Sequence, residues 1–509
     1  MADYLLGIDI GTSSTKVGVF DSSGKLFASA SNSYPTYREG PLRAEQDPRD
    51  WWQAAVRGIR SVLQSVEPRE IAGIGIAGQS WAALPVDSQG RPLRRAMIWL
   101  DRRAETECEE IREKVGEEKV LRVSGNRIDP AFCIPKILWL KRNEPEVFRN
   151  AFKFLQSNSF IVKKLSGAFS QDISQGYGVY GFDMARAEWS GEILEELGLE
   201  PGLFPELFPP SAVVGEVTRE ASLETGLAEG TPVVAGGLDA ACATLGGGVA
   251  RPGETQEQGG QAGGMSICTD RPVVTPRLIL GFHVIPGVWL LQGGTVGGGS
   301  LGWFLETFGQ VGRIATGPGE GGFELLSREA ARVSPGSGGL VFLPYMAGER
   351  SPIWDQDARG VLIGLSYDKT WAEVVRAIME GCAYALRHNL EVAEEAGAWV
   401  LQLISVGGAA KSEVWCQIKA DVTGKPVAVP DVEEGTIWGA ALLAGMGVGI
   451  YGDIVTSIRE MVHIKRVFHP REEISRVYDG FFEIYLSAYE GLKDTFRKLR
   501  ESTKEAGAL

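Results

Sequence analysis

The chain has 509 residues, and its 51 basic against 65 acidic residues give a formal net charge of −14. One hydrophobic core seldom organises a chain this long, so we expect two domains. The acidic balance argues against a nucleic-acid-binding surface, which needs a basic face. Without a secretory signal or a stretch of apolar residues long enough to span a bilayer, we expect a cytoplasmic protein with no membrane partner.

The first predicted element is a β-hairpin. Two apolar runs, residues 5–10 and 17–20, flank a turn of glycine, serine and threonine. The hydrogen-bonding groups in and around this turn belong to Gly11, Thr12, Ser13, Ser14 and Lys16. Backbone amides beside a cation form anion-binding concavities, so we expect a phosphate here. The alternative is a polar hairpin turn with a surface lysine.

A carboxylate stands directly before the same turn. Asp9 would repel a phosphate unless a metal ion lay between the two groups. Mg²⁺ keeps several waters and takes only one or two carboxylates, so a Mg²⁺-nucleotide fits better than a free phosphate. The spacing also differs from a Walker loop, which runs from a strand through Gly-x-x-x-x-Gly-Lys-Ser/Thr into a helix.

The next elements predict an α/β domain. A third strand is expected over residues 25–30, and Asp47-Pro48 opens a helix with an N-cap and a proline at the first helical position. A buried strand follows over residues 71–76. The order so far is three strands, a helix and a strand.

Polar and aromatic residues follow that last strand, where α/β proteins place their ligands. We expect one pocket to be lined by Gln79, Ser80, Trp81, Trp99, Asp101 and Arg102. An aromatic face beside hydroxyl-binding side chains suits a sugar. The alternative is that both tryptophans are core residues.

A second carboxylate is expected at the start of a helix. A strand ends in the turn Gly236-Gly237, and Asp239 follows where a helix begins. A helix N-terminus favours an ionised carboxylate, which can accept a proton from a substrate hydroxyl. The alternative is that Asp239 only caps the helix.

The second half of the chain repeats the opening pattern. Residues 254–268 predict a second strand–turn–strand with Gly260 and Gln261 in its turn, as a duplicated phosphate clamp requires. Gly299 lies in a glycine-rich turn that opens a helix. A strand at residues 404–406 ends at a glycine pair that lets a nucleotide approach the backbone closely. The residues from this pair onward are Gly407, Gly408, Ala409, Lys411 and Ser412.

Six cysteines without CxxC spacing and four histidines without paired spacing complete the sequence-based expectations. They indicate buried free thiols in a reducing compartment, not disulfides or a zinc site.

Longer motifs carry a family resemblance. Residues 360–365 and 373–380 reproduce one signature, residues 135–140 fit part of another, and residues 44–48 and 344–352 add further motifs. On these residues the chain resembles the FGGY carbohydrate kinase family, closest to its xylulokinase and gluconokinase-type members.

The resemblance implies an α/β fold of two actin-like (ribonuclease H-like) domains with a central cleft. Residues 1–249 would hold the sugar site and first phosphate loop, residues 250–470 the nucleotide site, and residues 471–509 a helix and a polar tail. ATP and Mg²⁺ would be the cofactors, with Asp9 near the metal. Asp239 would be the catalytic base, residues 11–16 would contact the phosphates, and residues 407–412 would lie near adenosine. The partner would be a small-molecule sugar, and a homodimer stays open.

Two departures from the family pattern bear on function. Xylulokinases usually have Met-His after Gly-Gln, where this chain has Ser80-Trp81, so we predict that D-xylulose is not its best substrate. The second turn usually reads Gly-Thr-Ser/Thr, where this chain has Gly260-Gln261-Ala262, and the Gln261 amide is our candidate replacement. We expect a kinase for a xylulose-like ketose. The alternatives are a kinase for another polyol, sugar acid or sugar derivative, and a weakened sugar or nucleotide sensor.

Overall fold

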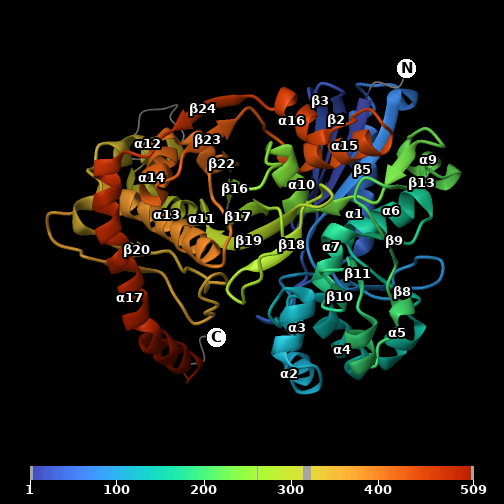
Figure 1. Cartoon of the computed structure of the whole chain (residues 1–509), viewed down its shortest axis with the longest axis horizontal. Helices are drawn as coiled ribbons and strands as arrows, with labels where there is room; N and C mark the ends of the chain where they lie inside the picture. The colour runs from blue at the N-terminus through green and yellow to red at the C-terminus, as the bar shows by residue number, and fades with distance from the viewer. Residues whose placement is uncertain (1–3, 261, 313–321, 506–509) are drawn as a thin grey trace.

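Two mixed β-sheets lie side by side in the computed structural model, which describes residues 4–260, 262–312 and 322–505 (Figure 1). Within these ranges the first sheet has the strand order β13-β14-β5-β1-β2-β3, with β15 beside β5. Its strands are β1 (Tyr4–Ile10), β2 (Ser14–Asp21), β3 (Leu26–Ser33), β5 (Ile71–Gly78), β13 (Val213–Glu216), β14 (Pro232–Val234) and β15 (Gly237–Leu238). The predicted hairpin is confirmed, since β1 and β2 pair antiparallel with Asp9 opposite Lys16.

The second sheet has the order β18-β19-β17-β16-β22-β23-β24. Its strands are β16 (Glu254–Gly259), β17 (Ala262–Thr269), β18 (Ile279–Phe282), β19 (Trp289–Val296), β22 (Gln402–Val406), β23 (Val427–Pro430) and β24 (Ile464–Phe468). The first sheet has the antiparallel meander β1-β2-β3, and the second has the antiparallel run β16-β17-β19-β18. In each sheet the first strand also has a parallel neighbour, β5 beside β1 and β22 beside β16. The repeated topology confirms the predicted second hairpin and the α/β class.

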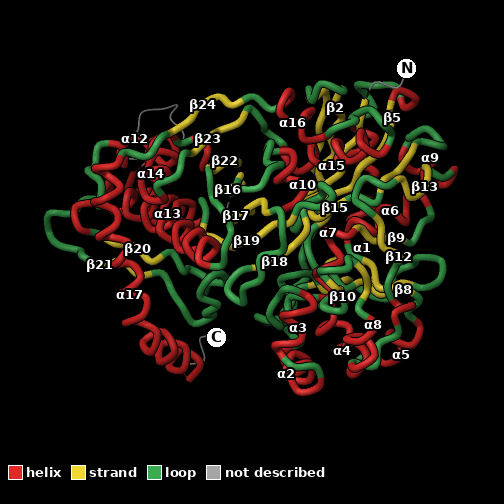
Figure 2. The backbone as a smooth tube through the Cα atoms, in the orientation of Figure 1, coloured by secondary structure: helices red, strands yellow, loops and turns green. Residues whose placement is uncertain are grey.

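Helices flank both sheets (Figure 2), and the short strands form separate two-stranded pairs outside the two sheets. In chain order the helices are α1 (Pro48–Val62), α2 (Glu105–Lys114), α3 (Glu117–Ser124), α4 (Cys133–Asn143), α5 (Pro145–Asn150), α6 (Ser157–Ser166), α7 (Ile173–Gly176), α8 (Gly191–Glu196), α9 (Arg219–Thr225), α10 (Asp239–Gly246), α11 (Gly299–Gly312), α12 (Gly322–Ala331), α13 (Trp371–Glu395), α14 (Glu413–Thr423), α15 (Gly435–Gly447), α16 (Ile454–Met461) and α17 (Glu472–Glu505). The short strands are β4 (Glu45–Gln46), β6 (Leu84–Val86), β7 (Ala96–Met97), β8 (Lys153–Leu155), β9 (Ser170–Asp172), β10 (Phe182–Asp183), β11 (Glu188–Trp189), β12 (Glu206–Phe208), β20 (Val341–Leu343) and β21 (Val361–Ile363).

Helix α1 begins as its sequence predicts. The Asp47 side chain accepts a hydrogen bond from the Arg49 amide, and Pro48 occupies the first helical position. Proline costs nothing there because the missing N–H would have no partner inside the helix. Trp51 and Ile59 are fully buried on the face that packs against β2 and β3.

The six cysteines are free and buried, as predicted. Across the described ranges no helix is both long and apolar enough to cross a membrane.

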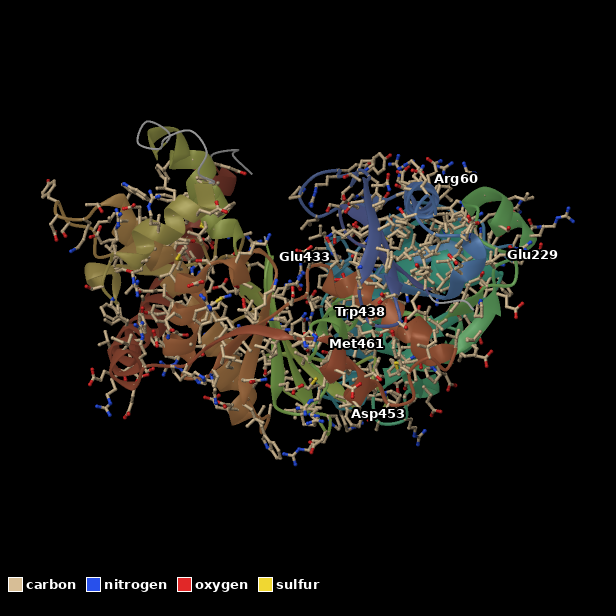
Figure 3. All side chains as sticks on the ribbon, turned by 90° about the horizontal axis from the view of Figure 1, so that it is seen from above. Arg60, Glu229, Glu433, Trp438, Asp453 and Met461 are labelled. Carbon is tan, nitrogen blue, oxygen red and sulfur yellow. The ribbon has the colours of Figure 1, made fainter. Side chains whose placement is uncertain are left out.

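Helix α15 lies on the first sheet although it comes late in the sequence. It packs against β1 and β5 and against α10. In Figure 3 Trp438 of this helix lies in the same lobe as Arg60 of α1, while Glu433 lies at the junction of the two lobes. The helix falls within the range predicted for the second domain, and the predicted domain limits stay a prediction.

Glycines allow this helix to approach so closely. A Cβ atom added at Gly75 of β5 would lie 1.9 Å from the carbonyl oxygen of Ala440, and one at Gly439 would lie 1.9 Å from that of Cys242. Both distances are far below van der Waals contact, and the obstructing atoms are backbone. A side chain at Gly75 could be accommodated only if α15 moved away from the sheet, and one at Gly439 only if α15 moved away from α10.

We expect Gly75→Ala to lower the free energy of unfolding by about 1–3 kcal/mol or more, because it overpacks a rigid backbone contact. Urea unfolding followed by circular dichroism measures the change. Gly480→Ala is the matched control: no atom lies within 4 Å of its added Cβ on α17, so it should stabilise by about 0.5–1 kcal/mol through helix propensity. Equal midpoints for Gly75→Ala and the native chain would contradict the role given to this packing.

Candidate active site

Side chains of the first lobe donate hydrogen bonds to the backbone carbonyls of the turn between β1 and β2. Tyr34 OH and Gln79 Nε2 donate to the Gly11 carbonyl, and Gln46 Nε2 donates to the Thr12 carbonyl at 2.6 Å. Because the peptide unit is planar and trans, a carbonyl held inward turns the next N–H outward. The amides of Thr12 and Ser13 therefore face away from the sheet, as an anion-binding turn requires.

Lys16, on the strand after the turn, already has an anionic partner. Its Nζ lies 2.8 Å from Glu434 Oε2, in the segment that leads into α15. Both side chains are partly exposed. An incoming phosphate could compete with Glu434 for the lysine.

Asp9 has a carboxyl oxygen without a partner among the residues that the structure describes. Its Oδ1 is buried and has no hydrogen bond. Burial, and then the nearby charge of Asp239, raise its pKa from 3.8 to about 8, while Lys16 acts in the opposite direction. An orphaned carboxylate oxygen is a suitable ligand for a cation. No cluster of three or more metal-ligating side chains occurs in the described ranges, but Mg²⁺ needs only one or two carboxylates.

Asp239 is the first residue of α10, and its N-cap is Leu238. The Asp239 Oδ1 accepts from the Ala240 amide at 2.7 Å. Burial raises the pKa of Asp239, and the hydrogen bond from Ala240 offsets part of the rise. The resulting pKa is about 6, above the ordinary value of 3.8. Gly236 lies before it at φ +86°, and a Cβ there would lie 2.1 Å from the Ile76 carbonyl oxygen, so the turn requires glycine.

The two carboxyl groups lie at the same edge of the sheet. Asp9 is close to the end of β1, Asp239 directly follows β15, and both strands neighbour β5. At this position the charge of Asp239 raises the pKa of Asp9. The structure thus brings together the predicted metal-binding and base residues.

The residues predicted for the sugar pocket divide into two groups. Trp99 donates from Nε1 to Thr12 Oγ1 at 3.0 Å, and Gln79 braces the Gly11 turn. Ser80 is half-buried. These three lie in or beside the carboxylate site.

The side chains of the other three residues, Asp101, Arg102 and Trp81, contact other residues of the protein. Asp101 is fully buried, and its oxygens accept from Arg103 at 2.6 Å and from the Ala44 amide at 2.8 Å. Arg102 makes a bidentate pair with Asp129 at 3.0 and 3.1 Å. Trp81 is buried and stacks on Phe132 with ring centroids 4.2 Å apart, so one indole face is covered.

A pocket of about 960 Å³ opens beside the second hairpin. Six of the residues predicted to bind the nucleotide line it: Gly260, Gly299, Gly408, Ala409, Lys411 and Ser412. Gly407 lies directly before them at φ +84°. Apolar and aromatic side chains from α11, α12 and α14 complete the wall, including Trp303, Phe323 and Val414. Gln261 lies outside the described residues.

Sequence patterns did not single out several residues of this site. Glu434 and Arg350 come from the second half, and Arg350 lies over the Trp99 ring at 5.1 Å from its centroid. Tyr34 and Gln46 hold the first turn. Gln46 and Arg350 belong to the 44–48 and 344–352 motifs, which indicated the family but not the role of either residue.

Known proteins with similar sequences and structures define the class. Residues 4–246 match the N-terminal domain, and residues 265–448 the C-terminal domain, of the FGGY family of carbohydrate kinases. The chain is 31% identical to a xylulose kinase of Bacillus subtilis over 506 residues, which cover 98% of this chain and 99% of that protein.

Solved structures agree with the sequence matches. Gluconate kinase from Lactobacillus acidophilus matches with a TM-score of 0.89 at 25% identity over 97% of this chain and 99% of that one. Xylulose kinase from Rhodospirillum rubrum matches with a TM-score of 0.88 at 28% identity over 97% and 100%. The fold is the actin-like fold of the FGGY phosphotransferases, as the sequence predicted. The chain belongs to the FGGY family of carbohydrate kinases.

The raised pKa of Asp9 predicts a pH-dependent stability. In the unfolded chain the carboxyl ionises near pH 3.8, whereas in the folded chain it keeps its proton up to about pH 8. Native stability should therefore fall as pH rises through this window, and Asp9→Asn should remove the effect. Without metal or nucleotide, we expect Asp9→Asn to be more stabilising at about pH 8.5 than at about pH 5, by at least about 1 kcal/mol in urea unfolding.

Asp368→Asn is the control. Side-chain hydrogen bonds from Lys369 and Ser366 lower the pKa of Asp368 to about 2, so this group is ionised in both states at both pH values and its replacement should act equally at each. An Asp9→Asn effect that is also equal at the two pH values would rule out the buried, protonated Asp9.

Proposed function

We propose that this carbohydrate kinase transfers the γ-phosphate of ATP to a hydroxyl group of a xylulose-like ketose, with Mg²⁺ as its metal. The observation that carries the proposal is the pairing of Asp9 and Asp239 at one sheet edge, beside a turn whose amides face outward. Phosphoryl transfer depends on positioning and charge neutralisation more than on covalent chemistry. The site offers both.

In this proposal the nucleotide spans the two lobes. The adenosine lies in the pocket of about 960 Å³, against Gly407, Gly408, Ala409, Lys411 and Ser412, with Gly299 at the start of α11. Its phosphates lie between the turn at Gly260 and the turn formed by Gly11, Thr12, Ser13 and Ser14. The Gln261 amide contributes to the second turn, as the sequence hypothesis has it.

Cations neutralise the phosphates. Asp9 would hold Mg²⁺, which supplies positive charge next to the transferred group when it is bound. Lys16 would exchange Glu434 for a phosphate oxygen. The pKa of Asp9 would fall in the presence of the metal, because a nearby cation favours the ionised carboxylate.

Asp239 is the proposed base. It accepts the proton of the attacking hydroxyl, and a pKa of about 6 leaves it ionised at neutral pH yet basic enough for that task. Gln79, Ser80 and Trp99 would contact the sugar. Asp101, Arg102 and Trp81 would shape the pocket through their partners Arg103, Asp129 and Phe132. Closure of the lobes would exclude water, which competes as the nucleophile.

A sugar acid is the second candidate substrate. A gluconate kinase is among the solved structures that this chain resembles over nearly its full length. The two candidates differ in charge, so one panel of substrates separates them.

The test is coupled ADP release with D-xylulose, other ketoses, polyols and sugar acids. We expect sugar-dependent turnover with a substrate other than D-xylulose as the best, because Ser80-Trp81 reshapes the pocket. Asp239→Asn should lower kcat by about 10²–10⁴-fold, and native kcat should fall below about pH 6 as Asp239 takes a proton. Asp453→Asn is the matched control, since Asp453 also stands at a helix start but caps the exposed start of α16.

Three outcomes would contradict parts of this proposal. Full kcat in Asp239→Asn would reject its role as base. A native preference for D-xylulose over the whole panel would reject the predicted substrate shift. ATP turnover that no sugar accelerates would favour the sensor.

A further inference from the structure

Two arginine–tryptophan contacts cross between the halves of the chain in opposite directions. The Arg350 guanidinium lies 5.1 Å from the centroid of the Trp99 ring, and the Arg127 guanidinium lies 4.7 Å from that of Trp354. Trp99 and Arg127 belong to the part that matches the N-terminal family domain, and Arg350 and Trp354 to the C-terminal one. Neither contact has a place in the proposed chemistry.

Arg350 is fixed to the second lobe. The next residue, Ser351, accepts from the Gly294 amide on β19 through its Oγ at 2.6 Å. Asn389 of α13 donates to the Gly294 and Ser351 carbonyls at 3.3 and 3.4 Å. The Glu349 carboxylate accepts from the Arg350 amide at 2.8 Å. Arg350 must therefore move when β19 and α13 move.

The Arg350 guanidinium lies over the Trp99 ring and close to Gly294 of β19. The charged groups near it are Glu349, Asp129 and Arg102, and Asp129 is already paired with Arg102 at 3.0 Å. In the described ranges no carboxylate lies within 4.0 Å of the Arg350 guanidinium. A cation–π contact strengthens when the cation is desolvated. Arg350 is desolvated in this way, since burial is the largest influence on its pKa and lowers it.

The far edge of Trp99 touches the phosphate turn. Its Nε1 donates to Thr12 Oγ1 at 3.0 Å. A continuous chain of contacts therefore runs from β19 through Arg350 and Trp99 to Thr12. The Arg127–Trp354 contact has no such continuation to the phosphate turn, because Trp354 Nε1 donates to the Arg277 carbonyl of its own lobe at 2.8 Å.

We propose that Arg350 is a positioning residue, which couples closure of the two lobes to the orientation of the first phosphate turn through Trp99. When the lobes close, Arg350 fixes the indole plane, and the indole N–H in turn holds the Thr12 hydroxyl. The idea rests on the proposed function in one respect, that this turn holds the nucleotide phosphates.

The direct readout is the indole N–H of Trp99, measured by nuclear magnetic resonance on protein labelled with ¹⁵N-tryptophan and assigned with Trp99→Phe. Arg350→Met keeps an apolar side chain but removes the charge. We expect it to speed hydrogen exchange of the Trp99 indole by about 2- to 30-fold, the range of a cation–π contact. Arg350→Lys keeps a cation and should restore part of the protection.

Arg127→Met is the matched control. It removes a contact of the same kind across the same interface, but one without a link to the turn. Exchange of the Trp99 indole should stay within about twofold of the native rate. Equal acceleration in Arg127→Met and Arg350→Met would show that general loosening of the lobes, not Arg350, governs Trp99, and would overturn the proposal.

Turnover gives a second test through double-mutant cycles with Thr12→Val. The effects of Arg350→Met and Thr12→Val on kcat should be non-additive by about 2- to 30-fold. Those of Arg127→Met and Thr12→Val should be additive. Additive effects in the Arg350 cycle would contradict the coupling.

The two tests separate this proposal from the proposed function. Indole exchange needs no turnover, so it decides the role of Arg350 even where no sugar is phosphorylated. Sugar-dependent turnover by the native protein together with unchanged indole exchange in Arg350→Met would leave the kinase function standing and remove Arg350 from it.

Discussion

The packing of α15 against α10 and the first sheet is the constraint on which the site depends. Gly75 and Gly439 bring the helix backbones into direct contact with their neighbours. Helix α10 begins at Asp239, β1 carries Asp9, and the segment before α15 carries Glu434, the partner of Lys16. One closely packed unit therefore sets the positions of the proposed base, the proposed metal-binding carboxyl and the lysine proposed to bind phosphate. It also carries the chain from the second lobe back to the first.

The charges of these residues favour the binding of a cation together with a phosphate. Asp9 has Asp239, Lys16 and Glu434 as charged neighbours, and burial disfavours the ionised forms of Asp9 and Asp239. In the protein alone, ionisation of Asp9 is unfavourable, so this carboxyl keeps its proton up to about pH 8. A Mg²⁺-nucleotide would bring the missing positive charge and would release Lys16 from Glu434 for a phosphate. Strain of this kind is expected where function, not stability, selects the residues.

Local sequence signals predicted much of the fold. The hairpins at residues 5–20 and 254–268, the capped start of α1 and the glycine turn before Asp239 each follow from patterns within a few residues. The family motifs supplied the two actin-like domains. Six predicted nucleotide-binding residues do line one pocket, whereas Gln261 stays untested.

Long-range contacts were the part that local patterns could not give. No local pattern indicates that the Ala44 amide, 57 residues away, donates to Asp101, or that the Phe132 ring covers Trp81. Glu434 and Arg350 lie more than two hundred residues from the turn they serve. Their roles appear only when the two halves are placed together in space.

The most direct test of this arrangement is a crystal structure with Mg²⁺ and a non-hydrolysable ATP analogue. We expect the adenine in the pocket between α11, α12 and α14. The terminal phosphate should lie within about 2.7–3.2 Å of the Thr12 or Ser13 amide nitrogen. An adenine ring bound outside this pocket, or phosphates that contact only one lobe, would contradict a nucleotide held between the two halves.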